Sequence, residues 1–208
     1  MSNYFNDEIR GKIARLISQI ESQSHVELVV SIKSRVHGYA EYPFFVGTVL
    51  AFIALTYFRF STDFYADWMV YTGTVFSFIL GAIMVGGIPV LHRLMVGQNR
   101  LRKFTEIMAR ASFQKGGIHH TVDKTGVLIF VAVWEKQIMI LPDRGVESAI
   151  PPGEWEQIQQ NFQEVFQSSN PASAFIAKLE GMSVVFSRYI PQVDSDINEL
   201  PDNLEIDL

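Results

Sequence analysis

Apolar residues recur with a helical period near the start of the 208-residue chain. From Asp7 to about Gln23, isoleucines and leucines follow one another every three or four residues, which predicts an amphipathic helix. Asn6 is suited to cap this helix, since an asparagine side chain accepts hydrogen bonds from the first free N–H groups. The next segment, residues 26–32 (VELVVSI), is short and rich in β-branched residues, so we expect a buried strand there.

Two long apolar stretches then follow, and they are typical of membrane-spanning helices. Between Tyr42 and Leu91 the only charged residues are Arg59, Asp63 and Asp67. We therefore predict a transmembrane hairpin over residues 39–91, with spans at about 43–60 and 67–91. Two buried core helices of a soluble protein are the alternative, but an apolar run of 24 residues is long for a core helix.

Small residues recur every four positions in the second span, at Gly73, Ser77 and Gly81. This spacing lets helices approach closely in lipid, either within the hairpin or against another subunit. Further along the same span, Gly86, Gly87 and Pro89 could kink the helix or end it.

Basic residues flank the hairpin unevenly. Lys33 and Arg35 precede it; Arg93, Arg100, Arg102 and Lys103 follow it; the connecting loop has only Arg59. The positive-inside rule then predicts a cell-membrane protein with two spans and both termini in the cytoplasm. The N-terminus lacks an uninterrupted apolar segment, so we expect no signal peptide.

Regular patterns resume after the hairpin. A charged amphipathic helix is predicted from His92 to about Lys115, followed by a strand hairpin made of residues 125–134 and 137–141. Proline-initiated helices are predicted from Pro151 to about Ser168 and from Pro171 to about Tyr189.

The two soluble segments belong together. An even number of spans returns the chain to the side that it left, so the early strand can pair with the later hairpin. We expect one α/β domain made of residues 1–38 and 92–191, with an acidic tail over residues 192–208.

Composition excludes several classes of site. There is no cysteine, hence no disulfide, thiolate metal site or cysteine nucleophile. The net charge of −5 argues against nucleic acid as a partner.

Several segments resemble the TPM domain, a family named for thylakoid-lumen, photosystem II repair and nematode receptor-auxiliary proteins. They are HVELVV at 25–30, HHTVDKTGVLIFVAVWEKQIMILPDRGV at 119–146, a tryptophan-containing helix and NELPD at 198–202. The resemblance covers about residues 8–32 and 92–203, and is strongest to bacterial members with an inserted two-span hairpin. It implies an α/β sandwich; some relatives are described as acid phosphatases or calcium binders, and bacterial members are often encoded beside LemA-type membrane proteins.

Candidate catalytic residues flank the predicted strand hairpin. His120 could act as acid or base, Asp143 could hold a cation or orient a water, and Arg144 could hold a phosphate. Thr121 and Asp123 lie nearby in sequence. The alternative is structural: Asp143–Arg144–Gly145 would be a turn, and Thr121 and Asp123 would order a loop.

Candidate metal ligands form two groups, and Ca²⁺ or Mg²⁺ would be the ion. The first group is Asp143 with Glu135, although Glu135 could be a solvated turn residue. The second resembles an EF-hand loop, but Glu199 replaces its central glycine and a solvated acidic tail is the alternative; its members are Asp194, Asp196, Asn198, Asp202 and Glu205. His119 and His120 form no zinc motif, because adjacent side chains are expected to diverge.

Because no complete catalytic motif is present, the sequence favours a non-catalytic component or scaffold of a membrane assembly. Its partners would be the lipid bilayer and another membrane protein, of LemA type by the resemblance, or a second copy of the chain. The alternative is a metal-assisted phosphatase with its site near His120, Glu135 and Asp143.

Overall fold

The computed structural model describes residues 4–193 and 205–207 of the chain. It forms two compact units. The first contains Met1–Val36 and Lys103–Leu208, and the second contains His37–Arg102. The first is the α/β domain, and the second is the helical hairpin with the short helix that follows it.

A four-stranded mixed sheet, in the order β3-β2-β1-β4, is the centre of the α/β domain. Strand β1 (Glu27–Lys33) pairs in parallel with β2 (Gly126–Ala132), although 92 residues separate them in the sequence. Strand β3 (Gln137–Pro142) runs antiparallel to β2. The expected split sheet is therefore confirmed. The sequence did not predict β4 (Glu205–Asp207), which pairs in parallel with β1.

Strand β2 has apolar side chains on both faces, and all seven of its residues are buried. Val127, Ile129 and Val131 belong to the larger hydrophobic cluster on one face. Leu128 and Phe130 belong to the smaller cluster on the other face. A strand that pairs on both edges and is covered on both faces consists of consecutive apolar residues, as the sequence indicated.

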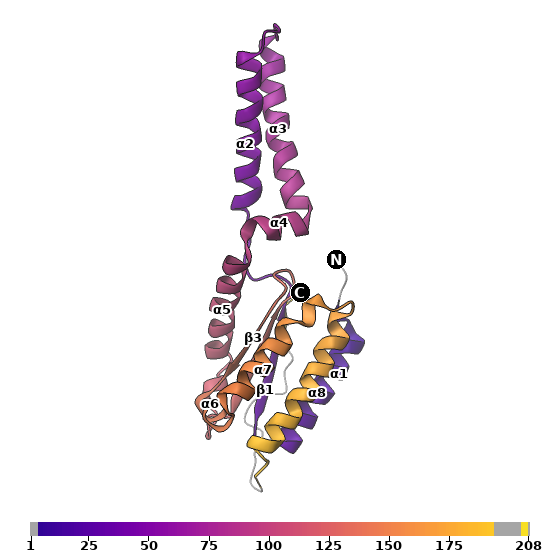
Figure 1. Cartoon of the computed structure of the whole chain (residues 1–208), viewed down its shortest axis with the longest axis vertical. Helices are drawn as coiled ribbons and strands as arrows, with labels where there is room; N and C mark the ends of the chain where they lie inside the picture. Colours follow the sequence, from indigo (N-terminus) through magenta and orange to yellow (C-terminus); the bar gives the residue numbers. More distant parts are fainter. Residues whose placement is uncertain (1–3, 194–204, 208) are drawn as a thin grey trace. The chain divides into compact units, whose positions relative to one another are not determined.

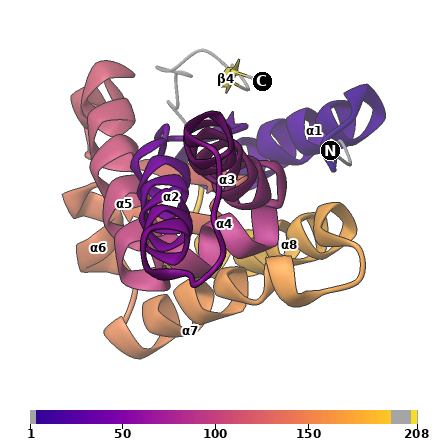
Figure 2. The same cartoon turned by 90° about the horizontal axis from the view of Figure 1, so that it is seen from above.

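Three helices cover the face of the sheet that carries the larger hydrophobic cluster, with α8 between α1 and α7 (Figures 1 and 2). Helix α1 (Asp7–Gln23) begins where the sequence predicted, and Asn6 Oδ1 accepts a hydrogen bond from the Ile9 N–H at 3.0 Å. Helices α7 (Pro152–Gln163) and α8 (Pro171–Tyr189) both begin at a proline. A proline suits this position because its missing N–H would have had no helical partner.

Helix α5 (Gln98–Lys115) and the short 3₁₀ helix η1 (Ile118–His120) cover the other face of the sheet. The sequence predicted one helix from His92 to Lys115, and this prediction is wrong. Gly97 adopts a φ of 78°, which interrupts the helical backbone. The segment therefore forms two helices, α4 (Pro89–Val96) and α5.

Two smaller differences occur beyond the strand hairpin. The structural alternative for Asp143–Arg144–Gly145 was a turn; in the structure, Asp143 caps a helix, α6 (Arg144–Ala149). The helix predicted to reach Ser168 ends at Gln163 and is followed by a 3₁₀ helix, η2 (Val165–Gln167).

The second unit contains an antiparallel pair of helices, α2 (Glu41–Phe60) and α3 (Asp67–Gly87). Both are long and apolar enough to cross a membrane. Helix α3 ends four residues earlier than predicted. Pro89 disfavours a helical conformation at the preceding residue, Ile88, whose φ of −109° and ψ of 98° are extended. Helix α4 then begins at Pro89.

Small residues let α2 and α3 approach closely. A Cβ atom on Gly81 would lie 3.0 Å from Gly47 Cα, and a Cβ atom on Gly47 would lie 2.7 Å from the Phe78 carbonyl oxygen. Gly73 similarly packs against the Phe58 ring. Gly73 and Gly81 therefore serve packing within the hairpin.

Candidate functional site

The three predicted catalytic residues lie at the end of the sheet where β1 and β2 begin and β3 ends; we call this the β-start end. His120 is in η1, in the segment before β2, whereas Asp143 and Arg144 follow β3. The Asp143 N–H donates to the Gly126 carbonyl at 2.8 Å, which joins the two segments. The structure thus brings together two loops that are about 20 residues apart in sequence.

Glycines make this junction tight. A Cβ atom on Gly145 would lie 2.6 Å from the Lys124 carbonyl oxygen and would also collide with the Asp123 carbonyl. A Cβ atom on Gly126 would lie 2.6 Å from Ile118 Cγ2. No side chain fits at either position, because real Cβ contacts are longer than this.

Asp143 is the best-placed candidate, since only 9% of it is exposed. Its Oδ1 accepts a hydrogen bond from the Arg144 N–H at 2.7 Å, as an N-terminal cap of α6. Its Oδ2 is buried and has no hydrogen-bond partner among the described residues. Asp143 therefore has both a structural role and one carboxylate oxygen that could contact a ligand.

A second buried carboxylate, which was not predicted from the sequence, lies at the same end of the sheet. Glu27 pairs with Gly126 across β1 and β2, while Asp143 flanks Gly126 on the β3 side. Glu27 is only 7% exposed. The signal was present in the sequence: a glutamate within an apolar strand is rarely buried without a reason.

The other polar groups of the β-start end bond to one another. His25 Nε2 and Asp123 Oδ2 are 2.8 Å apart, which links the start of β1 to the segment before β2. Thr121 Oγ1 accepts a hydrogen bond from the Thr125 N–H at 3.1 Å, and Lys124 Nζ donates to the His119 carbonyl at 2.6 Å. Thr121 and Asp123 therefore order this loop, as the structural interpretation expected.

The expectation that the His119 and His120 side chains diverge is wrong. Their ring centroids are 3.9 Å apart, with an interplanar angle of 55°. Both residues are in the 3₁₀ helix η1, and their rings are in contact there.

Glu135 does not share a site with Asp143. It lies in the β2–β3 turn, at the other end of the six-residue strand β3, about 20 Å away at the usual rise per residue. Its Oε1 accepts a hydrogen bond from the Val36 N–H at 3.0 Å, and only 1% of it is exposed. The predicted Asp143–Glu135 metal pair is thus not formed, and Glu135 is not a solvated turn residue.

No group of three His, Asp or Glu side chains suited to a metal ion occurs within the described residues. Asp194, Asp196, Asn198 and Asp202, predicted as an EF-hand-like set, lie outside that part of the chain. The Glu205 backbone is in β4, paired with Ser31.

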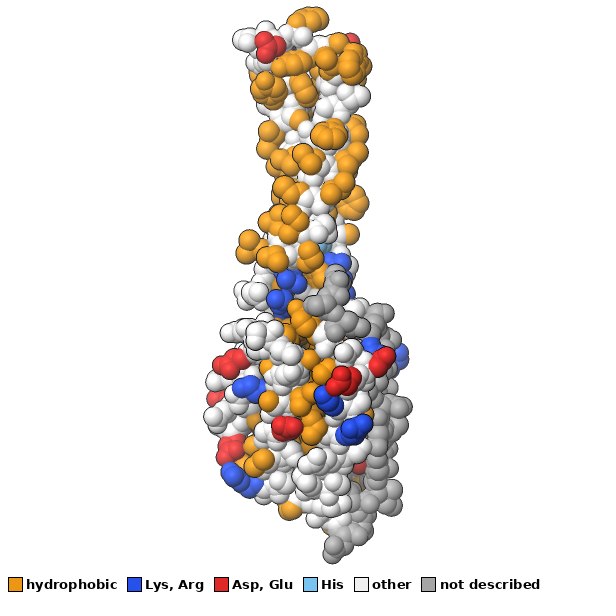
Figure 3. All heavy atoms as spheres, turned by 90° about the vertical axis from the view of Figure 1, so that its right-hand side faces the viewer, with side chains coloured by type: hydrophobic (Ala, Val, Ile, Leu, Met, Phe, Trp, Pro, Cys, Tyr) orange, Lys and Arg blue, Asp and Glu red, His pale blue; other side chains and the backbone are white. Residues whose placement is uncertain are grey.

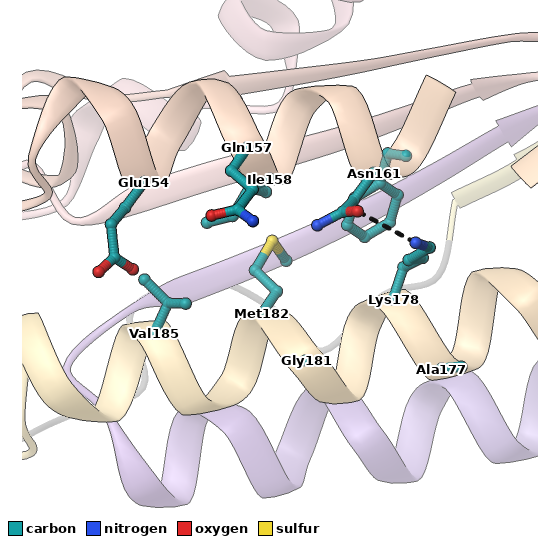
Figure 4. Close-up of a pocket in the computed structure, with 10 residues that line it drawn as sticks. Glu154, Gln157, Ile158, Asn161, Ala177, Lys178, Gly181, Met182 and Val185 are labelled. Atoms are coloured by element: carbon teal, nitrogen blue, oxygen red, sulfur yellow. Dashed lines mark hydrogen bonds between the residues drawn. The ribbon is translucent and has the colours of Figure 1, made fainter. Parts of the chain in front are cut away.

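A groove of about 250 Å³ lies between α7 and α8 (Figure 4). Ile158, Phe162 and Met182 provide apolar walls, and Lys178 Nζ donates to Asn161 Oδ1 at 3.1 Å. The groove is smaller than most small-molecule sites, which occupy about 300–1,000 Å³.

These features define an α/β domain that is split in sequence by a helical hairpin and carries its polar cluster at the β-start end. Residues 94–185 match the family model of the TPM domain. The resemblance noted in the sequence is thereby confirmed for this range.

A solved structure supports the same fold over a longer range. The chain is similar to the NMR structure of the BA42 protein from the psychrophilic bacterium Bizionia argentinensis sp. nov., with a TM-score of 0.60 and 15% sequence identity. The similarity covers 100% of this chain and 98% of the other. No curated protein matches the chain.

Proposed function

We propose that this protein is a membrane-anchored TPM domain that serves as a non-catalytic component of a membrane protein assembly. The hairpin α2–α3 is the membrane anchor. The observation that carries this proposal is the apolar outer surface of the two helices.

Large apolar side chains cover the hairpin along its length (Figure 3). Among them, Phe52 is 69% exposed, Phe76 66% and Ile83 64%. Water disfavours so continuous an apolar surface, whereas lipid accommodates it. Helices of 20 and 21 residues are about 30 Å long, which matches the hydrocarbon core of a bilayer.

The threonine hydroxyl groups of the hairpin are compatible with lipid. Each of the four threonines in α2 and α3 donates to the backbone carbonyl four residues earlier, at 2.7–2.9 Å: Thr48, Thr56, Thr72 and Thr74. A hydroxyl that is bonded within its own helix can enter the bilayer without leaving a polar group unsatisfied.

The β-start end supports a non-catalytic role. His25, Asp123, Thr121 and Lys124 each bond to a neighbouring part of the domain. Side chains engaged in this way hold loops together and are less available to a substrate. A partner would be a LemA-type membrane protein, by family resemblance, or a second copy of this chain.

Mild extraction in a neutral detergent and sizing of the particle tests this proposal. We expect a particle clearly larger than one 23.6-kDa chain with its detergent, containing a second protein or a second copy. A monomer without partners, extracted from native membranes under conditions that preserve other complexes, would refute the assembly role. Release by alkaline carbonate would refute the membrane anchor.

A phosphatase is the second candidate, and the buried Asp143 Oδ2 favours it. With Glu27 on the other side of Gly126, two carboxylates could hold a Ca²⁺ or Mg²⁺ ion that binds a phosphate. His120 is exposed nearby and could transfer a proton, and Arg144 could hold the phosphate.

Hydrolysis of a generic phosphomonoester with calcium, magnesium or manganese tests the phosphatase. The reaction should be lost in Asp143→Asn, which retains an oxygen that can cap α6. It should persist in Glu135→Gln, at the opposite end of β3. Absence of turnover with all three ions would exclude this candidate.

A further inference from the structure

Helix α4 has an apolar outward face. Val90 and Leu94, one turn apart, are 67% and 77% exposed, whereas His92 and Val96 on the opposite side are 4% and 5% exposed. A helix that faces water carries polar residues outward. The outward face of α4 is therefore suited to an apolar medium.

The position of α4 at the end of the hairpin is well defined. It contacts both α2 and α3 and lies crosswise to α3 (Figure 1). His92 Nε2 is 2.9 Å from the carbonyl oxygen of Tyr39, which lies two residues before the start of α2. Tyr39 is fully buried, so this contact holds α4 against the beginning of the hairpin.

The apolar surface of α3 continues onto α4. Ile83 near the end of α3 and Ile88 at the junction are both exposed, and Val90 and Leu94 extend this surface. A helix that turns aside at the end of a span and keeps its apolar face exposed is typical of one lying in the membrane interface.

Cations follow this surface. Arg93 is in α4, and Arg100 and Arg102 are at the start of α5. At the same end of the hairpin, this unit has one carboxylate, Glu41. Arg100 donates to the Tyr42 hydroxyl and lies 3.9 Å from the Glu41 carboxylate. By contrast, the opposite end of the hairpin, residues 59–67, contains one arginine and two aspartates.

We propose that α4 lies in the membrane interface and that Arg93, Arg100 and Arg102 bind the phosphate of an anionic phospholipid there. Val90 and Leu94 contact the acyl chains of the same leaflet. This inference rests on the proposed function, because it requires α2 and α3 to span the bilayer. It adds an acidic lipid as a specific ligand.

The expected effect is large enough to measure. An arginine close to an anionic lipid surface favours binding by about 1 kcal/mol, or about fivefold. Three arginines, opposed by Glu41, should favour an anionic over a zwitterionic lipid by on the order of tenfold or more.

Lipid retention by the full-length protein in a neutral detergent provides the test. Phosphatidylglycerol and phosphatidylcholine with identical acyl chains are titrated, and bound lipid is counted by native mass spectrometry. We expect preferential retention of phosphatidylglycerol, and its reduction to the phosphatidylcholine level in R93Q/R100Q/R102Q. The matched control, K12Q/R15Q/R110Q, removes three exposed cations of the other unit and should retain the preference.

Two further arms make the result specific. Glu41→Gln should increase phosphatidylglycerol retention, because it removes the opposing carboxylate. Inorganic phosphate and glycerol phosphate at millimolar concentration should not displace the lipid; if they do, the arginines form a site for soluble phosphate and the lipid proposal is wrong.

Equal retention of the two lipids, or an unchanged preference in R93Q/R100Q/R102Q, would overturn this inference. The proposed membrane anchor is tested separately by carbonate extraction. A protein that stays in the membrane but shows no lipid preference would refute only the lipid site, whereas release by carbonate would refute the anchor as well.

Discussion

At the scale of single residues, Gly126 decides how closely η1 packs on the sheet. A methyl group there would meet Ile118, with Cγ2 only 2.6 Å away. We expect Gly126→Ala to lower the free energy of unfolding by about 1–3 kcal/mol, because the added carbon must displace backbone as well as side chain. Thermal unfolding in detergent, followed by circular dichroism, would measure this.

Gly11→Ala is the matched control. Gly11 is inside α1, and an added Cβ atom would meet nothing within 4 Å. This substitution should raise stability by up to about 1 kcal/mol, since alanine favours a helix more than glycine. Similar effects of the two substitutions would contradict the close packing of Ile118 on Gly126.

Glu135 is the second residue with a definite role, because it joins the two parts of the split domain. Its Oε1 accepts from the Val36 N–H, which follows β1, while Glu135 itself follows β2. Glu135→Ala should cost about 1–3 kcal/mol by leaving a backbone donor unsatisfied. Glu135→Gln retains an acceptor and should recover much of this loss in the same unfolding measurement; equal losses would argue against the bond.

At the scale of elements, the close contact between α2 and α3 depends on Gly47 and Gly81. Replacing Gly47 with valine would push Phe78 and α3 away, since even a Cβ atom would be 2.7 Å from the Phe78 carbonyl. We expect a lower melting temperature of the helical signal in detergent, because packing drives helix association in lipid-like media.

Gly87→Val is the control for the hairpin, because no atom lies within 4 Å of a Cβ at this position. It should leave the melting temperature nearly unchanged. If Gly47→Val and Gly87→Val behave alike, the small residues do not determine the packing of α2 on α3.

At the scale of the whole molecule, the distribution of basic residues predicts how the proposed membrane anchor is oriented. The chain has no native cysteine, so single cysteines can be introduced without background. Asp63→Cys should react with a membrane-impermeant thiol reagent added to intact cells, and Lys115→Cys should be protected until the cells are opened. The opposite pattern would reverse the proposed topology.

The parts of this fold that could be predicted depend on neighbouring residues in the chain. Asn6 and the isoleucine stripe define α1, and Pro171 after Asn170 defines the start of α8, because capping and periodicity are local. The break at Gly97 was missed, whereas an end of α3 near Gly86, Gly87 and Pro89 was one of the two outcomes expected there. A glycine or proline within an amphipathic segment indicates that the helix can be interrupted, but the residue at which the helix ends also depends on the packing around it.

The candidate site could be predicted only in part. The segments containing His120 and Asp143 do meet, because β2 and β3 form a hairpin with a short turn. Glu27 was overlooked, since its position beside Gly126 depends on the register of a parallel pair formed across 92 intervening residues. Glu135 was wrongly grouped with Asp143, because nearness in sequence across a hairpin does not mean nearness in space.

By itself, the sequence determined the two apolar helices, the split α/β domain and the TPM resemblance. Hydrophobic periodicity is a property of the sequence, and an even number of apolar helices returns the chain to the side that it left. The tertiary structure decided which polar groups meet. It placed two carboxylates beside Gly126, sent Glu135 to the other end of β3 and turned the apolar face of α4 outward. These outcomes depend on strand register and helix packing between distant segments, which no local pattern specifies.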